Sequence, residues 1–340
     1  MQTQSALNHL KTLGAQIHAG MYPSQILYNL GKEGFYRAFL DKGAQGLAEA
    51  IDNVAKVAQI CGNTGFCVWA HSSLIWYLLN SCNMTEKQKE LFNNLSLGVT
   101  LGGTGLSNPL KAFVGLDKMR LKAKRTKDGI LLNGTLPWVS NLQAGNYFAI
   151  IAELESSKTL SAQSCIMALV VCDENLKLKN VAPFCAYEGS GTYSCVFKDY
   201  AVSKEFILSD PADKILGKIN AGFVALQCGM GVGLCKNALN QIKKPYLQEK
   251  RIEILSAKLE RIEHKIAHLA KKPYAPNALN SYLRIKSQLI ALVNELANLC
   301  IMHSGASGYI QGSKASKLLA EGAFFSIVSP SYGHIQKLLG

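Results

Sequence analysis

The sequence has 340 residues, of which 48% are apolar and 17% charged, and its formal net charge is +13. This length allows more than one packed layer, and this apolar fraction is typical of a folded soluble protein. Residues 1–4 are not a basic region followed by an apolar core, so we expect no secretory signal. The longest apolar run, 165–172, is far shorter than the roughly 18 residues of a membrane span. We therefore expect a soluble, cytoplasmic protein without a membrane segment.

The ten cysteines form neither a Cys-x-x-Cys pair nor a zinc-type spacing. Most lie in apolar stretches, where a free cysteine packs as a small hydrophobic residue. We expect reduced cysteines and no metal site.

The first part of the chain, 1–96, has apolar residues at helical spacing and is expected to form a helical domain. The Gly-Asn-Thr-Gly run at 62–65 is expected to interrupt the helices before the apolar stretch 66–79. Thr85 is expected to cap the next helix, with Gln88 completing a capping box.

The middle part, 97–210, has a different pattern and is expected to form a β-domain. Short runs that favour strands occur at 121–125, 130–132, 147–152, 165–171 and 193–197. Turn signals separate them, such as Lys-Asp-Gly and Asn-Gly.

The last part, 211–340, again has helical spacing and is expected to form a bundle. Leucine and isoleucine recur at spacings of three and four from Leu255 to Leu269 and from Leu289 to Leu299. Prolines at 273 and 276 separate the two stripes, which indicates two neighbouring helices joined by a stiff turn.

Much of the positive charge lies in this last part. The segment 243–286 has eleven lysines and arginines and four glutamates. A solvated helix face explains this pattern, and so does a surface for an acidic partner. Nucleic acid, coenzyme phosphates and another subunit are the partners considered.

A glycine-rich segment lies near the start of the bundle. Residues 223–228 are compatible with a short strand, and Gly-Met-Gly-Val-Gly follows at 229–233. A dinucleotide-binding fingerprint needs a third glycine where Leu234 stands, and an acidic residue at the end of a later strand. The alternative is one long helix whose small residues allow another helix to cross closely.

Several segments carry a resemblance to a known family. They are Asp-Gly-Ile-Leu-Leu-Asn-Gly at 128–134, Trp-Val-Ser-Asn at 138–141, the run 191–202, His-Ser-Gly-Ala-Ser-Gly-Tyr at 303–309 and Ile-Gln-Lys-Leu-Leu at 335–339. In this order and context they closely resemble segments of the acyl-CoA dehydrogenase family. The resemblance covers most of the chain, although the chain is shorter than is typical of that family.

The resemblance implies an α+β fold with an N-terminal helical domain (1–96), a middle β-barrel or sandwich domain (97–210) and a C-terminal helical bundle (211–340). It also implies FAD or FMN as cofactor, an acyl thioester or another small molecule as substrate, and a homodimer or homotetramer with flavin at a subunit interface. The cofactor-binding positions that it implies are Thr104, Gly105, Ser107, Trp138, Ser140, Gly305 and Gly308.

The residue types at these positions suit a flavin. The isoalloxazine ring is flat and largely apolar, so the Trp138 side chain could pack against it. Ser140 would offer its hydroxyl to the central nitrogen of the ring. Gly105 would let the backbone approach the ring without a Cβ atom.

The catalytic base of the family is missing. The family removes an α-proton with a glutamate that corresponds here to Ser329 or Pro330, or in some members to a position near Phe223. Glu188 and Glu321 match neither place, and Glu321 is expected on the surface.

Two cofactor-binding segments also differ from the family pattern. Leu-Gly-Gly at 101–103 replaces a Glu-Pro pair, and Lys-Lys-Pro-Tyr at 243–246 stands where the family has an Arg-x-x-Phe-Gly segment.

Three functions are compatible with this pattern. One is a flavin enzyme that does not dehydrogenate acyl-CoA, and another is a dehydrogenase with a relocated base. The third is a non-catalytic binding or scaffold protein on the same fold, attached to nucleic acid through the basic segment 243–286. The leading prediction is a flavin-dependent oxidoreductase whose catalytic residues the sequence does not identify.

Overall fold

The computed structural model describes residues 3–81, 83–156, 159–181, 183–242 and 248–340. It begins with helices, as predicted. They are α1 (Thr3–His18), α2 (Ser24–Lys32), α3 (Ala38–Lys42), the 3-10 turn η1 (Gly43–Gly46), α4 (Leu47–Ile60), α5 (Gly62–Leu79) and α6 (Glu86–Ser96).

The middle part contains the strands and a few short helices. They are β1 (Gly102–Thr104), α7 (Ser107–Phe113), β2 (Leu121–Arg125), β3 (Gly129–Val139), β4 (Tyr147–Leu154), η2 (Ala162–Ser164), β5 (Cys165–Val171), β6 (Lys177–Asn180), η3 (Glu188–Ser190), β7 (Tyr193–Ser203), η4 (Lys204–Phe206) and β8 (Ile207–Ser209). Each of the five predicted strand segments lies within one of these strands.

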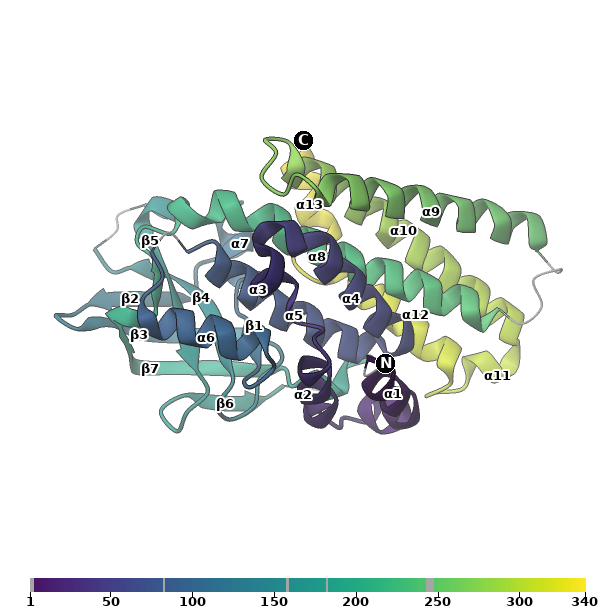
Figure 1. The fold of residues 1–340 in the computed structure, drawn as a ribbon, viewed down its shortest axis with the longest axis horizontal. Coiled ribbons are helices and arrows are strands. Elements are labelled where there is room, and N and C mark those ends of the chain that lie inside the picture. The colour runs from purple at the N-terminus through teal and green to yellow at the C-terminus, as the bar shows by residue number, and fades with distance from the viewer. Residues whose placement is uncertain (1–2, 82, 157–158, 182, 243–247) are drawn as a thin grey trace.

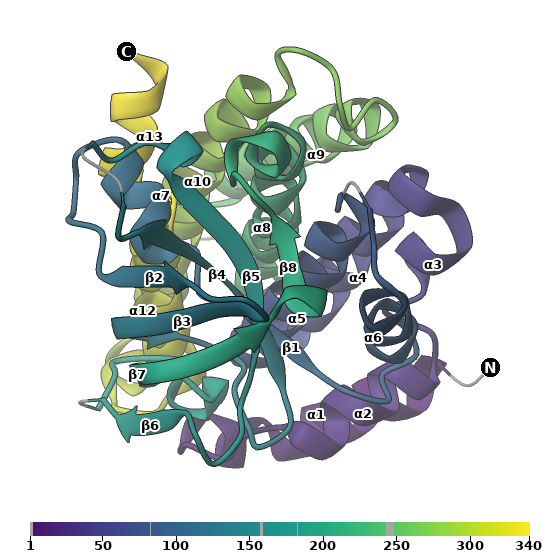
Figure 2. The ribbon, with the colours of Figure 1, turned by 90° about the vertical axis from the view of Figure 1, so that its left-hand side faces the viewer.

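The described strands form one mixed sheet in the order β6-β7-β3-β2-β4-β5-β8, with β1 also paired to β4. The pairs β1–β4 and β2–β4 are parallel and the others antiparallel. The sheet is strongly twisted and lies beside the helices rather than between two layers of them (Figure 2).

The last part is helical. Its elements are α8 (Asp213–Gln241), α9 (Glu249–Ala270), α10 (Ala278–Ser304), α11 (Ala306–Tyr309), α12 (Lys314–Ile327) and α13 (Tyr332–Leu339). Helices α8, α9 and α10 run side by side (Figure 1), α4 and α5 pack against α8, and the first part of α8 reaches β8 of the sheet.

Two apolar clusters hold these parts together. In β4, Phe148 and Ile150 belong to a cluster inside the sheet domain, whereas Ala149 and Ile151 belong to a second cluster shared with the helices. Successive residues of a strand point to opposite faces, so a strand that is buried on both faces reads as a continuous apolar run. The second cluster includes residues of α1 to α6, α8 to α10, α12 and α13, and therefore joins the N-terminal and C-terminal helices into one core.

The glycine-rich segment is part of the long helix α8, so the short strand at 223–228 and the dinucleotide-binding interpretation are wrong. A Cβ atom on Gly229 would lie 2.5 Å from the carbonyl oxygen of Ile51, and one on Gly233 would lie 2.5 Å from that of Ala55. The glycines are therefore needed where α8 crosses α4 closely.

The predicted interruption at 62–65 is also wrong, because α5 begins at Gly62 and only Cys61 separates it from α4. A Cβ atom on Gly65 would lie 2.5 Å from the Ala58 side chain, so this glycine serves a close contact between the two helices.

The predicted cap of α6 is half correct. The Thr85 hydroxyl accepts a hydrogen bond from the Gln88 N–H at 3.2 Å. The Gln88 side chain donates instead to the carbonyl oxygens of Glu205 and Ile207, so it ties the helix to the sheet domain.

The basic segment is mostly a solvated helix face. Leu255, Leu259 and Ile262 of α9 are buried, and many of its lysines and arginines lie on the opposite, exposed side. Lys286 is an exception, because it is fully buried. Lys243 and Lys244 lie outside the described residues.

Helices α8 and α10 are long and apolar enough to cross a membrane by length and composition, but most of each is buried inside the protein. They are explained as core helices. The described cysteines are free, and all but Cys185 are buried.

Candidate functional site

A cavity of about 340 Å³ lies where the sheet domain meets α5, α8 and α12. Four predicted cofactor-binding residues line it: Thr104, Ser107, Trp138 and Ser140. A single concave, mostly apolar cavity with a few polar groups is the usual form of a small-molecule site. The tertiary structure therefore brings together predicted residues from two separate segments of the sequence.

Trp138 lies near the end of β3, and 51% of its surface is exposed. Its ring centre is 6.0 Å from that of Phe184, which also lines the cavity. A core tryptophan would be buried on all sides, whereas this ring presents an open apolar face. That exposure fits a platform for a flat ligand.

Ser140 belongs to a chain of hydroxyl groups in the cavity wall. The Thr192 hydroxyl donates to Ser140 Oγ at 2.8 Å and lies 2.7 Å from Ser190 Oγ. A hydroxyl has one proton to donate, so Ser140, as the acceptor from Thr192, keeps its own proton free for a ligand. The donor role of Ser140 toward flavin stays a prediction.

Asn141 fixes the turn after Ser140, a role that the sequence reasoning missed. Its backbone is left-handed (φ 64°), its side-chain amide donates to the Gly102 carbonyl, and its side-chain oxygen accepts from the Tyr22 hydroxyl. Asparagine tolerates this conformation better than most residues. An asparagine directly after the motif serine was the available signal.

Strand β1 is held against the same turn. The His71 ring accepts from the Gly102 N–H through Nδ1 and therefore donates through Nε2 to the Leu95 carbonyl, both at 3.0 Å. A Cβ atom on Gly103 would collide with the Ser140 carbonyl oxygen. Gly105 is less crowded, since its nearest contact would be at 3.1 Å, so Gly103 is the position where close approach demands glycine.

The resemblance implies that the family's glutamate corresponds to Ser329 or Pro330, or in some members to a position near Phe223. Phe223 and Ser329 line this cavity, and the Ser329 hydroxyl lies 2.7 Å from that of Ser107. Among the described residues that line the cavity, Lys111 is charged and none is a carboxylate. The missing base is therefore not replaced within the cavity wall.

Lys286 and Gln227 hold the segment that contains Ser329. The Lys286 ammonium donates to Gln227 Oε1 and to the carbonyl oxygens of Val328 and Pro330 at 2.5, 2.9 and 2.7 Å. Gln227 donates to the Ser329 carbonyl at 2.7 Å. Burial lowers the pKa of Lys286 to about 7, while the three acceptor oxygens favour its charged form.

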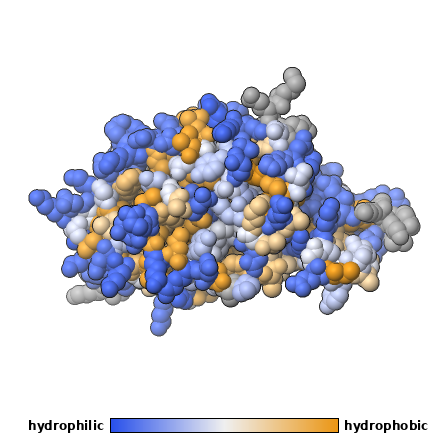
Figure 3. Space-filling model, turned by 90° about the horizontal axis from the view of Figure 1, so that it is seen from below, coloured by the Kyte–Doolittle hydropathy of each residue, from blue (hydrophilic) through white to orange (hydrophobic). Residues whose placement is uncertain are grey.

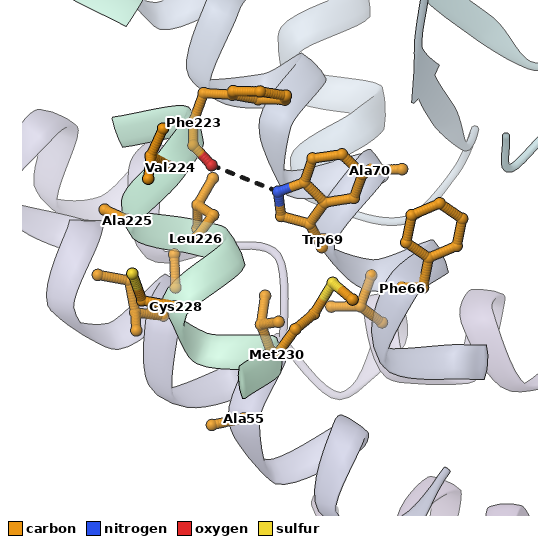
Figure 4. Close-up of a cluster of buried hydrophobic side chains, with 14 of the residues drawn as sticks. Ala55, Phe66, Trp69, Ala70, Phe223, Val224, Ala225, Leu226, Cys228 and Met230 are labelled. Carbon is orange, nitrogen blue, oxygen red and sulfur yellow. Dashed lines mark hydrogen bonds between the residues drawn. The ribbon is translucent and has the colours of Figure 1, made fainter. Parts of the chain in front are cut away.

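The inner end of the cavity is aromatic. Figure 4 shows Phe66 and Trp69 of α5 facing α8, with the Trp69 indole N–H donating to the Phe223 carbonyl at 3.4 Å. The Phe66 ring stacks on Trp69, and Phe324 meets Phe66 edge to face. These rings close the cavity on the helical side.

Glu321 is buried, with 2% of its surface exposed, so its expected surface position is wrong. Its carboxyl group lies against Gly62 at the start of α5. Burial raises the pKa of this carboxyl to about 8. Glu188 is used locally, because its carboxylate accepts from the Phe184 N–H.

Gly305 and Gly308 do not line this cavity. They lie at the junction of α10 and α11, and α11 is at the end of the helical part away from the sheet (Figure 1). Gly308 lines a separate hollow with His303 and Asn240. Their cofactor-binding role stays a prediction.

Comparison with known proteins agrees with this architecture. No protein-family model matches the chain. The short-chain specific acyl-CoA dehydrogenase of Clostridium acetobutylicum is 23% identical over 268 residues, which cover 74% of this chain and 67% of that protein.

Solved structures agree over the whole chain. Butyryl-CoA dehydrogenase from Megasphaera elsdenii has a TM-score of 0.84 at 17% identity, covering 99% of this chain and 97% of that one. A glutaryl-CoA dehydrogenase complex with glutaryl-CoA gives 0.83 at 19%, covering 99% and 93%. FMN-bound TdsC from Paenibacillus sp. A11-2 gives 0.82 at 14%, covering 98% and 94%.

The chain therefore has the fold of acyl-CoA dehydrogenases, and it is similar in sequence to one of them.

Proposed function

We propose that this chain is a flavin-dependent oxidoreductase that binds the flavin ring against Trp138 and does not use the family's catalytic glutamate. The observation that carries the proposal is the shared cavity. Trp138 and Ser140 line it from one side, and the two positions of the family's base, Phe223 and Ser329, line it from the other.

The residues of the cavity fit a flavin ring. Trp138 offers an exposed aromatic face, Ser140 keeps a free donor, and the backbone near Gly103 comes close to the cavity wall because no side chain intervenes. Bound flavin would supply two-electron chemistry that side chains lack. FAD is the expected cofactor, and FMN is the second to be tried, since one structural neighbour is FMN-bound.

The protein side of the mechanism follows from what the cavity contains. Ser140 donates a hydrogen bond to the ring, and the aromatic wall formed with Phe66 and Trp69 excludes water from the substrate. Neither Phe223 nor Ser329 can remove an α-proton from a thioester. We therefore expect weak acyl-CoA dehydrogenation, and oxygen-dependent reactions of small apolar substrates are the second class to test.

We also propose that the chain assembles as a homodimer or homotetramer. Ile327, in the cavity wall, is 64% exposed, and Tyr309 and Ile310 beside the predicted glycines are 81% and 64% exposed. Hydrophobic residues also lie exposed among hydrophilic ones on the face in Figure 3. The cytoplasmic location stays a prediction.

The nucleic-acid alternative has less support. Basic side chains of α9 are exposed, but Arg251 pairs with Glu295 at 3.0 Å, and Glu263 of α9 pairs with Lys236 at 2.6 Å. Salt-dependent DNA binding by a protein that ignores flavin would favour that alternative.

The test is a visible absorption spectrum of the purified protein before and after FAD or FMN is added, followed by a binding titration. We expect Trp138→Ala to weaken flavin binding about tenfold, because the ring loses its stacking surface. Tyr274→Ala is the matched control, since Tyr274 is 53% exposed but does not line this cavity.

A protein that stays colourless with both flavins would overturn the proposed function. Unchanged affinity in Trp138→Ala would overturn only the placement of the ring.

A further inference from the structure

The innermost wall of the cavity consists of three aromatic rings in mutual contact. The ring centre of Tyr187 lies 5.3 Å from that of Phe66 and 4.5 Å from that of Phe324, and those of Phe66 and Phe324 are 5.1 Å apart. Tyr187 is buried, and its hydroxyl has no hydrogen-bond partner among the described residues. Tyr187 therefore lines the cavity, and its hydroxyl is an unpaired ionisable group buried beside the cavity on the helical side.

A buried polar group lies behind this wall. Glu321 precedes Phe324 by one helical turn of α12, and its carboxyl atoms lie within 2.7 Å of where a Cβ atom on Gly62 would be. The backbone N–H of Asn63 faces the carboxylate and favours its charged form. This carboxyl thus lies at the first turn of α5, the helix that also carries Phe66.

Four buried polar atoms in this region have no partner among the described residues. They are Glu321 Oε1, Tyr187 Oη and both side-chain polar atoms of Asn63. Folded proteins rarely leave buried polar groups unpaired, and ordered water is the usual solution where several such groups converge. The cluster is therefore a group of unpaired polar atoms inside an otherwise apolar core.

His18 links this cluster to the surface. Its Nδ1 lies 3.9 Å from Glu321 Oε1, and 17% of its side chain is exposed. The end of α1 packs directly on the turn that carries Tyr187, since a Cβ atom on Gly189 would collide with the carbonyl oxygens of Ile17 and Met21.

The charges around the carboxyl set its protonation. Burial raises the pKa of Glu321 to about 8, although Lys317 on the same helix acts in the opposite direction. Burial, with Lys317, lowers the pKa of His18 to about 4. Burial also raises the pKa of the neighbouring Cys61 thiol to about 11. At neutral pH the carboxyl is therefore mostly protonated and His18 neutral, so the two are not an ion pair.

We propose that Tyr187 and Glu321 form a proton relay between the flavin cavity and the surface at His18. Tyr187 gives its Oη proton to a ligand in the cavity that takes up a proton, and the Glu321 carboxyl replaces it by donating its own proton to Tyr187 through water. A proton from bulk solvent then returns to Glu321 past His18, so that the net change is one proton moved from solvent to the ligand. Release of a proton from the ligand follows the same steps in reverse. No electrons pass through these groups.

The relay would provide the proton donor and acceptor that the cavity wall lacks at the family's base positions. Chemistry on a flavin takes up and releases protons, and this cavity has no carboxylate at either of the family's base positions. Tyr187 stays neutral before and after each transfer, so the rise in its pKa caused by burial and by Glu321 does not block the relay. This inference rests on the proposed flavin function.

The first test uses the protein without flavin and follows ¹³C-labelled glutamate side chains by NMR between about pH 5 and pH 9. The resonance that disappears in Glu321→Gln identifies the carboxyl. We expect it to titrate near pH 8 and to move to higher pH in Tyr187→Phe, because the carboxylate loses a nearby donor. Tyr282→Phe is the matched control, since Tyr282 is also buried and unpaired at its hydroxyl but lies on α10, outside the cavity wall.

The second test uses the FAD-loaded protein, with dithionite as reductant and a pH-indicator dye to record proton uptake in a stopped-flow instrument. We expect Tyr187→Phe and Glu321→Gln to slow proton uptake at least about tenfold. Glu153→Gln, which removes a buried carboxylate that pairs with Lys122 in the sheet, should match the wild type.

The outcomes are separable. A Glu321 carboxyl that titrates below about pH 5, the ordinary range for glutamate, would overturn the relay whether or not flavin binds. Bound FAD with unchanged proton uptake in both variants would overturn it as well. A protein that retains no FAD would contradict the proposed function, while the NMR titration would still decide whether Tyr187 and Glu321 are coupled.

Discussion

Lys286 and Glu321 are both buried ionisable residues near the candidate cavity, but their surroundings differ. The three N–H donors of Lys286 meet three acceptor oxygens, and its ammonium also lies 5.6 Å from the centre of the Phe325 ring. Glu321 has an oxygen without a partner among the described residues, next to other unpaired groups.

This difference in hydrogen bonding indicates two different roles for a buried ionisable group. A group whose hydrogen bonds are all made serves to hold structure, here the segment around Ser329. A group left incomplete can gain or lose a proton without breaking a network, which suits transfer. The number of completed hydrogen bonds distinguishes the two roles better than burial alone.

The largest effect is expected from Lys286→Met. This change leaves the carbonyl oxygens of Val328 and Pro330 and the Gln227 side chain without their donor, and should lower the free energy of unfolding by about 3–5 kcal/mol. Denaturant unfolding measures it. Lys265→Met, on the exposed face of α9, should change stability by less than about 0.5 kcal/mol. Similar small values for both would show that the Lys286 network is not structural.

The next effect is a pH dependence from Glu321. Its pKa in the folded protein, about 8, is above the ordinary 4.5, so its contribution to stability is complete below about pH 4.5 and is lost as pH rises towards 8. Between pH 5.5 and 7.5 the wild type should lose about 3 kcal/mol relative to Glu321→Gln. Paired unfolding curves at several pH values measure this difference. If the unfolding free energies of the wild type and Glu321→Gln changed equally with pH, burial would not raise the pKa of Glu321.

The smallest effect is expected from Gly62→Ala. The added methyl group would lie 2.6–2.7 Å from the Glu321 carboxyl atoms and should destabilise the protein by about 1–2 kcal/mol. Combining it with Glu321→Ala should remove that penalty, because the shorter side chain leaves room. The control Gly217→Ala lies at an open, exposed helical position and should be neutral or slightly stabilising. If Gly62→Ala destabilised the wild type and the Glu321→Ala protein equally, that result would contradict the close contact between Gly62 and the Glu321 carboxyl.

The burial of these two residues was harder to predict from the sequence than the fold. Glu321 follows Leu318 and precedes Phe325 at helical spacing, and Lys286 lies between Leu283 and Leu289 in the same way, so both stand on apolar helix faces. That spacing was a usable signal of burial. A charged residue type argues against burial by itself, because most lysines and glutamates are exposed.

By itself the sequence determined the order of helical and sheet parts, each predicted strand segment and the Trp138–Ser140 motif, because these depend on local periodicity and on short contiguous patterns. Only the tertiary structure decided that Gly62 begins a helix and that Ser329 and Phe223 face one cavity. It also decided that Glu321 lies behind Tyr187. These facts depend on contacts between residues far apart in the chain, which local patterns do not encode.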